Sequence, residues 1–347
     1  MKKADIELQF NWIFVLIVGT VILAFFIGVV MKQKGFAEQK TGVQLSADLE
    51  TITTGAEVSK GTAQIIKVPQ LGIEFRSEDC LRRYSIGGGT KQYREKIIFA
   101  PGLIKGNEIL AWTMDWNVPY RVTNFLFLTS PQMRYILIDL SGANELAFQV
   151  NKSLPNEMYR ELVTNPNSII NNRNYKVRLA YFSALPSQIV VPDELQSVND
   201  KDLTAVNIVS STPYKTGTLT FYEKKGSSFQ PVGQTYILGI LSIYGAIFTD
   251  DYEMYNCNMK EAFKKMNFVT TIIQNRTNVL YNDVAICMDE YYLSFMPLQT
   301  IAAESSILMS IFPVSSQARV DSLYNAAFVE LESSNRNLQL QSCPELY

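Results

Sequence analysis

A run of 22 residues without a formal charge, residues 10–31, constrains this chain more than any other feature. As one α-helix the run would cover about 33 Å, which matches a hydrocarbon core of about 30 Å. A helix satisfies its own backbone hydrogen bonds, and Asn11 and Thr20 are the only clearly polar side chains in the run. We therefore predict a transmembrane helix. The side chains expected to hold this anchor in lipid are Phe10, Trp12, Phe14, Leu16, Phe25 and Phe26.

Two other interpretations of the N-terminus stay open. A cleaved secretory signal has a shorter apolar core, and residues 31–34 contain no small-x-small cleavage pattern, so an uncleaved anchor is favoured. A type IV pilin-like leader would be cut before the helix and would leave a glutamate at the fifth mature position. Here the small residue is Ala4, which would make Glu7 the third residue instead.

Composition excludes several classes of function. Without residues 1–35 the chain keeps 27 basic and 31 acidic residues, a net charge of −4, so we expect no nucleic-acid partner. The chain has no histidine, which removes the Ser-His-Asp and Cys-His catalytic sets and histidine-based zinc sites. The segment 87–91, Gly-Gly-Gly-Thr-Lys, lacks the spacing of a phosphate-binding loop. We predict no catalytic residue, cofactor or metal, which favours a protein without enzymatic activity.

The cysteines Cys80, Cys257, Cys287 and Cys343 have no Cys-x-x-Cys spacing. We interpret them as two disulfides, and of the three possible connectivities we prefer Cys257 with Cys287, which leaves Cys80 for Cys343. Four unpaired buried thiols are the alternative. Disulfides form in oxidising compartments, so this interpretation favours a cytoplasmic N-terminus and a body outside the cell membrane.

The anchor divides the chain into four segments. A short tail at residues 1–9 precedes the helix, a helical stalk follows at residues 32–60, and residues 61–347 form an extracytoplasmic α/β domain. We place a candidate sub-boundary between residues 225 and 250. The stalk has good helix formers and a thin apolar pattern, so self-association through it, or contact with other envelope proteins, is a candidate role.

The body has the sequence pattern of a mixed α/β fold: a mixed β-sheet with flanking helices, then a mostly helical C-terminal third. Residues 153–163 resemble a helix that opens at a serine cap and a first-turn proline. Residues 226–249 carry no charge but contain only a short dense apolar part, which favours a buried core element over a second span. The predicted strands are residues 63–68, 72–76, 96–99, 108–114, 120–128, 134–140, 175–182, 205–210, 217–224 and 229–232.

Some carboxylates and aromatic residues deserve a functional interpretation beside a structural one. Asp250 with Glu253 is interpreted as a capping box, and the pair at 289–290 as part of a solvated loop. Trp112 and Trp116 resemble a carbohydrate platform, although a packed strand is the simpler interpretation. A carboxylate-dependent hydrolase would need several of these acids to converge in one cleft. The acids considered for that role are Asp115, Asp250, Asp251, Asp289 and Glu290.

Segments 6–14 and 116–126 resemble a group of uncharacterised single-pass membrane proteins of archaea, and residues 255–257 are similar to the cysteine-bearing helical region of that group. The resemblance implies an N-terminal anchor and an extracytoplasmic domain, and it transfers no functional residues. The sequence thus predicts a protein held in the lipid bilayer that serves as a binding or structural module of the cell envelope. The alternatives are a type IV pilin-like filament or secretion-system subunit, and a membrane-anchored carboxylate-dependent hydrolase.

Overall fold

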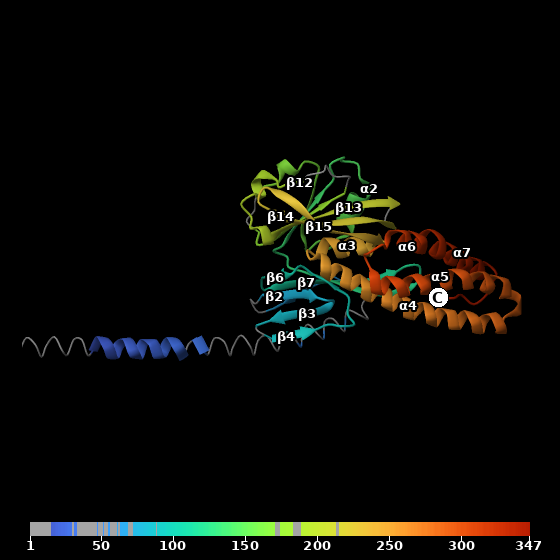
Figure 1. Ribbon diagram of the computed structural model, residues 1–347, viewed down its shortest axis with the longest axis horizontal. Helices are drawn as coiled ribbons and strands as arrows, with labels where there is room; N and C mark the ends of the chain where they lie inside the picture. The colour runs from blue at the N-terminus through green and yellow to red at the C-terminus, as the bar shows by residue number, and fades with distance from the viewer. Residues whose placement is uncertain are drawn as a thin grey trace, which may run out of the picture.

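The computed structural model (Figure 1) has a mixed α/β fold with three β-sheets and a helical C-terminal third, in agreement with the predicted fold class. The described residues are 15–29, 31–32, 47, 51, 55, 61, 63–68, 72–87, 89–170, 174–182, 189–212 and 215–347.

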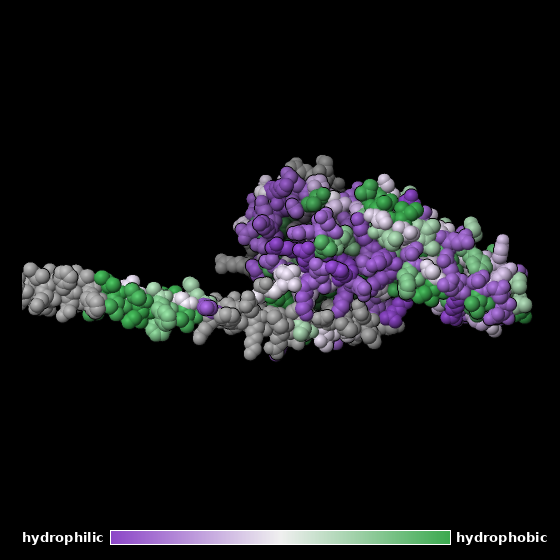
Figure 2. Space-filling view, turned by 60° about the horizontal axis from the view of Figure 1, so that its bottom comes forward, coloured by the Kyte–Doolittle hydropathy of each residue, from purple (hydrophilic) through white to green (hydrophobic). Residues whose placement is uncertain are grey.

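Residues 15–29 form a helix, drawn blue in Figure 1, whose side chains are mostly apolar and exposed. Leu16 is 64% exposed, Phe25 67% and Phe26 59%, and Figure 2 shows this helix as a mainly hydrophobic surface. Within the described part of the chain, no helix combines the length and apolar character needed to cross a membrane. The predicted tail, the anchor residues Phe10, Trp12 and Phe14, and nearly all of the predicted stalk lie outside the described residues.

Two four-stranded sheets form a sandwich. Sheet A has the order β1-β7-β8-β5 and sheet B the order β4-β3-β2-β6. Apolar side chains of β2, β3, β5, β7 and β8 fill the space between them, as the alternation of buried and exposed positions along β2 and β3 requires. The strands are β1 (Ala63–Lys67), β2 (Ile73–Glu78), β3 (Leu81–Ile86), β4 (Gly89–Gln92), β5 (Ile98–Phe99), β6 (Leu103–Ile104), β7 (Glu108–Asn117) and β8 (Arg121–Thr129).

The third sheet, sheet C, is mixed and has seven strands in the order β10-β9-β11-β13-β14-β15-β12. Following this order across the sheet, neighbouring strands from β10 through β13 are parallel. Neighbouring strands from β13 through β12 are antiparallel. The strands β14 and β15, which include the predicted strands 217–224 and 229–232, form a hairpin. The strands are β9 (Arg134–Ile138), β10 (Tyr159–Val163), β11 (Val177–Tyr181), β12 (Ile189–Val190), β13 (Leu203–Thr212), β14 (Thr216–Lys225) and β15 (Ser228–Leu238).

The prediction of a helix at residues 153–163 is wrong. The helix of this region, α2 (Glu145–Ser153), begins after Asn144, whose side chain accepts a hydrogen bond from Ala147 N, and ends where the prediction begins. Residues 159–163 are strand β10, which pairs in parallel with β9. Pairing with β9 at the edge of sheet C therefore determines the conformation of residues 159–163, against the local helix signal of the serine and proline.

Helix α3 (Ile240–Phe248) lies between sheets A and C and is buried on nearly every side. Its Tyr244 and Phe248 contact Trp112 of β7, and Phe248 also contacts Tyr135 of β9. A helix enclosed by two sheets must be apolar all round, which explains why α3 carries no charge. The interpretation as buried core is confirmed for the dense apolar part, at the end of β15 and in α3, whereas residues 230–232 of β15 are exposed.

The helical third consists of two long antiparallel helices with shorter helices beside them (Figure 1). Its elements are α4 (Tyr252–Asp283), α5 (Met288–Ile311), α6 (Gln317–Ser322), a π-helical turn (Leu323–Phe328) and α7 (Val329–Leu340). The predicted cap needs correction, because Asp251 rather than Asp250 caps α4 by accepting a hydrogen bond from Met254 N. Asp289 and Glu290 lie in the first turn of α5 and not in a loop, where acidic side chains favour the positive end of the helix dipole.

All four cysteines form disulfides, but the preferred connectivity is wrong. Cys80 pairs with Cys257 and Cys287 with Cys343, with Cα–Cα distances of 5.1 and 6.2 Å. Cys257 lies near the start of α4, and roughly 39 Å of continuous helix separates it from the end of α4, beyond which Cys287 lies. The closeness of Cys257 and Cys287 in sequence was therefore misleading, since a rigid helix keeps them apart.

Candidate functional site: the groove between α4 and β8

An open groove of about 1050 Å³ runs between α4 and the first half of β8, and we call it the α4–β8 groove. One side consists of α4, the other of β8, and Met309 of α5 also lines the groove. The residues that line it are Glu95, Arg121, Val122, Thr123, Asn124, Glu261, Lys264, Lys265, Asn267, Phe268, Thr271 and Met309. Its volume is at the upper end of the range for ligand pockets in proteins.

Sheet topology creates the groove. The two-residue strand β5 pairs with β8 only at Leu126 and Phe127. Beside the first half of β8 lies α4 instead of a further strand, because Val122 and Phe125 of β8 belong to the same core as α4. A helix is thicker than a strand, so its solvent-facing side chains rise above the level of the sheet and form a wall.

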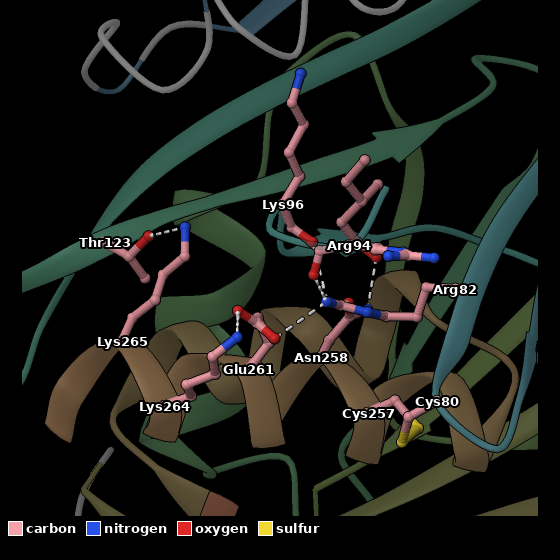
Figure 3. A network of polar contacts seen from close by, with 11 residues as sticks. Cys80, Arg82, Arg94, Lys96, Thr123, Cys257, Asn258, Glu261, Lys264 and Lys265 are labelled. Carbon is pink, nitrogen blue, oxygen red and sulfur yellow. Dashed lines mark hydrogen bonds and ion pairs between the residues drawn. A yellow bond between two sulfur atoms is a disulfide. The ribbon is translucent and has the colours of Figure 1, made fainter. Parts of the chain in front are cut away.

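A buried arginine, Arg82, bonds to several groups beside the charged side chains of the groove (Figure 3). Arg82 of β3 is only 4% exposed, and its guanidinium donates to Lys96 O and to Asn258 Oδ1, both at 2.9 Å, and to Arg94 O. It also forms an ion pair with Glu261 at 3.4 Å. Burial lowers the pKa of Arg82, while the charge of Glu261 raises it. Since an arginine starts from so high a value, it stays protonated at neutral pH.

The disulfide Cys80–Cys257 lies next to this network (Figure 3). It joins the turn between β2 and β3 to α4, one residue before Asn258. Asn258 also donates to Ile98 O at 2.6 Å, so one turn of α4 is bonded covalently to sheet B and through hydrogen bonds to β5. The groove is therefore built on a part of α4 whose position is fixed from two sides.

The cations of the groove differ in how well their charge is balanced. The Arg121 guanidinium is 3.4 Å from a carboxylate oxygen of Asp115, and the Lys264 ammonium is 3.5 Å from one of Glu261. Lys265 is partly buried, and its ammonium contacts the hydroxyl of Thr123 at 3.4 Å. No carboxylate of the described residues lies within 4.0 Å of the Lys265 ammonium, so its charge has no ionic partner there.

The acids considered for a hydrolase occupy three separate places. Asp250 and Asp251 line a second cleft of about 900 Å³ beside β13 and β14. Asp250 accepts from Gly102 N at 2.7 Å and pairs with Lys176, and Asp251 caps α4. Asp115 lies on β7, and the pair at 289–290 on α5. Asp250 and Asp251, which line the same cleft, thus already have structural partners.

Trp112 and Trp116 are 4% and 1% exposed and belong to the main core, which confirms the packed-strand interpretation and excludes a carbohydrate platform. Across the residues that the structure describes, no group of three acidic or cysteine side chains is arranged to hold a metal ion.

Sequence reasoning missed Arg82, Lys264 and Lys265. One signal was available: α4 is apolar at its buried positions near its start except for Asn256 and Asn258, and a polar side chain on a buried face needs a partner. Asn258 finds that partner in Arg82. The two lysines gave no signal, because charged residues on the solvent face of a helix are common.

Comparison with known proteins gives no relative: the chain matches no protein-family model, no curated protein and no solved structure. A functional proposal for this chain therefore depends on its own residues.

Proposed function

We propose that the chain is a membrane-anchored binding module of the cell envelope, with a cytoplasmic N-terminus, one transmembrane helix at residues 10–31, a stalk at residues 32–60 and the folded body outside. The α4–β8 groove is the binding surface of this module. The observation that carries the binding role is Lys265, a partly buried ammonium in an open groove without a carboxylate partner among the described residues. A ligand anion there would compensate the cost of desolvating that charge.

Two observations support the anchor and the location. Residues 15–28 of the uncharged run are exposed on a helix, and a continuous apolar surface of this kind is unfavourable in water and favourable in lipid. Both cysteine pairs lie at disulfide distance, which favours an oxidising compartment for the body.

Cell fractionation tests the anchor. We expect the full chain to sediment with membranes, to stay there at high salt and alkaline pH, and to be released by detergent. The variant Leu16→Arg/Phe25→Arg is expected to shift toward the soluble fraction, because each charge at the centre of a span costs about 2.5–3.5 kcal/mol. Wild-type protein that stays in the supernatant without detergent would overturn the anchor. Protease treatment of intact cells then tests whether the body lies outside.

Photo-crosslinking in intact cells tests the groove. A photoreactive residue in place of Thr271, inside the groove, is compared with one in place of Ser306, which is exposed on α5 and does not line the groove. We expect adducts from position 271 that are lost when Lys265→Glu is added, and none of these from position 306. Adducts that are equal at both positions, or that do not respond to Lys265→Glu, would contradict a binding role for the groove.

A further inference from the structure

We infer that the ligand of the α4–β8 groove is an acidic polypeptide segment, bound in extended conformation, with carboxylates at one end and an apolar side chain about two residues away. The inference rests on the proposed function, because it assumes that the groove binds a ligand. It is carried by the distribution of charge and apolar surface along α4.

Cations dominate the groove and the smaller cavity that adjoins it at Glu95. Two acids lie among these residues, Glu95 and Glu261, and Glu261 is paired with the buried Arg82. The chain as a whole has a net charge of −2, so this positive region is a local feature and not a consequence of composition. The cations are Lys91, Arg94, Lys96, Arg121, Lys264 and Lys265.

Figure 3 shows how these side chains lie. Lys264 and Lys265 project from neighbouring positions of α4, one toward Glu261 and the other toward Thr123 on β8, while Lys96 extends away from the Arg82 network. Two ammonium groups on one wall of a groove match carboxylates of a ligand, and such complementary charge favours both correct orientation and rapid association.

The groove also offers apolar surface. Phe268, which is 67% exposed, and the partly buried Met309 line it, together with Asn267 and Thr271. Phe268 follows Lys264 by four positions and Lys265 by three on α4, a rise of about 4.5–6 Å, and an extended peptide covers that length in about two residues. A peptide with carboxylates near Lys264 and Lys265 would therefore place a side chain two residues further on against Phe268.

Two other anionic ligands fit less well. An acidic polysaccharide has carboxylates but no apolar side chain to cover Phe268 and Met309. An anionic lipid surface is flat, whereas the partly buried Lys265 lies inside a groove. Both remain outcomes of the test.

The test measures binding of fluorescent peptides to the full chain in uncharged detergent micelles by fluorescence anisotropy. The probes are Glu-Glu-Glu-Leu-Phe, its glutamine counterpart Gln-Gln-Gln-Leu-Phe, and Glu-Glu-Glu-Ser-Ser, which lacks the apolar end. We expect the first to bind about tenfold more tightly than either of the others, with an affinity that falls as salt is added.

Variants locate the site. Lys265→Glu is expected to weaken binding of the acidic peptide about tenfold and Phe268→Ser about fivefold. The matched control is Lys201→Glu, which reverses one charge at an exposed position of the other cleft and should change affinity less than about twofold. Thermal unfolding of each variant, followed by circular dichroism, shows that the fold is intact.

Equal binding of the glutamine peptide, or equal effects of Lys201→Glu and Lys265→Glu, would overturn the inference. Polygalacturonate or anionic vesicles that bind more tightly than the acidic peptide, with the same dependence on Lys265, would also overturn it while leaving the binding role of the groove in place. If none of these probes binds and position 271 gives no specific adduct in cells, the proposed function fails as well.

Discussion

The ring of Phe99 packs directly against the backbone of Gly245, the residue at the centre of α3. A Cβ atom added at Gly245 would lie 2.8 Å from the nearest ring carbon of Phe99. Sheets A and C enclose α3, and Phe99 itself is 0% exposed, so neither partner has room to move. The close approach of this helix to sheet A therefore requires glycine.

We expect Gly245→Ala to lower the free energy of unfolding by about 1–3 kcal/mol through overpacking. Denaturant unfolding of the full chain in detergent measures this change. Gly89→Ala is the control, because a Cβ there would be 3.5 Å from Ile86 O, an ordinary contact. Adding Phe99→Leu to Gly245→Ala should cost less than the sum of the two single changes, and strict additivity would argue against the contact.

The disulfide connectivity makes a direct prediction. Peptide mapping without reduction should give linked fragments that contain Cys80 with Cys257 and Cys287 with Cys343. Replacement of Cys287 and Cys343 by serine should lower the free energy of unfolding by up to about 4 kcal/mol in the chain-entropy model, because the bond closes a long loop. A linked fragment that joins Cys257 to Cys287 would contradict the arrangement of α4 and α5.

Arg82→Met tests whether the buried arginine organises the groove. The substitution leaves the carbonyls of residues 94 and 96 without their donor and removes the ion pair between Arg82 and Glu261, so we expect a loss of roughly 2–4 kcal/mol in unfolding free energy. Arg76→Met is the matched control. Arg76 also forms an ion pair, with Glu74, but its side chain is 69% exposed, so less than about 1 kcal/mol is expected. Equal losses of unfolding free energy in the two variants would show that burial of the arginine does not determine the size of the loss.

The raised pKa of Asp251 predicts that the stability of the protein depends on pH. Burial raises the pKa of this carboxyl above its ordinary value of 3.8, and the neighbouring charges of Asp250 and Glu253 raise it further. The folded state therefore binds the proton more tightly than the unfolded state does. The associated stability is fully present below the ordinary value and is lost as pH rises through the higher folded value.

Asp251→Asn should remove this decline, because asparagine also caps a helix but carries no charge. Unfolding free energies measured between about pH 4 and pH 8 should fall less with rising pH in the variant than in the wild type. Asp283→Asn, at the exposed end of α4, serves as the control and should keep the wild-type slope. A variant with the same slope as the wild type would contradict the assignment.

Local pattern predicted most of the elements. Alternating or continuous apolar runs located the strands of sheet A and five of the seven strands of sheet C, but in sheet B they located only β2 and missed β3, β4 and β6. The prediction of a helix at 153–163 failed, because it relied on a local signal, the serine and proline at its start. Residues 159–163 pair with the neighbouring strand β9 instead. The cap at Asp250 failed for a similar reason, since Lys176 and Gly102 N, both distant in sequence, already engage that carboxylate.

By itself the sequence determined the mixed α/β class, the helical C-terminal third, the burial of the dense apolar part of residues 226–249 and the participation of four cysteines in disulfides. These properties follow from composition and periodicity, which are local. Only the tertiary structure decided which cysteines pair and that Arg82 meets Asn258, 176 residues further on, beside Lys264 and Lys265. Such pairings depend on how rigid helices and sheets pack in space, and separation along the chain carries almost no information about that distance.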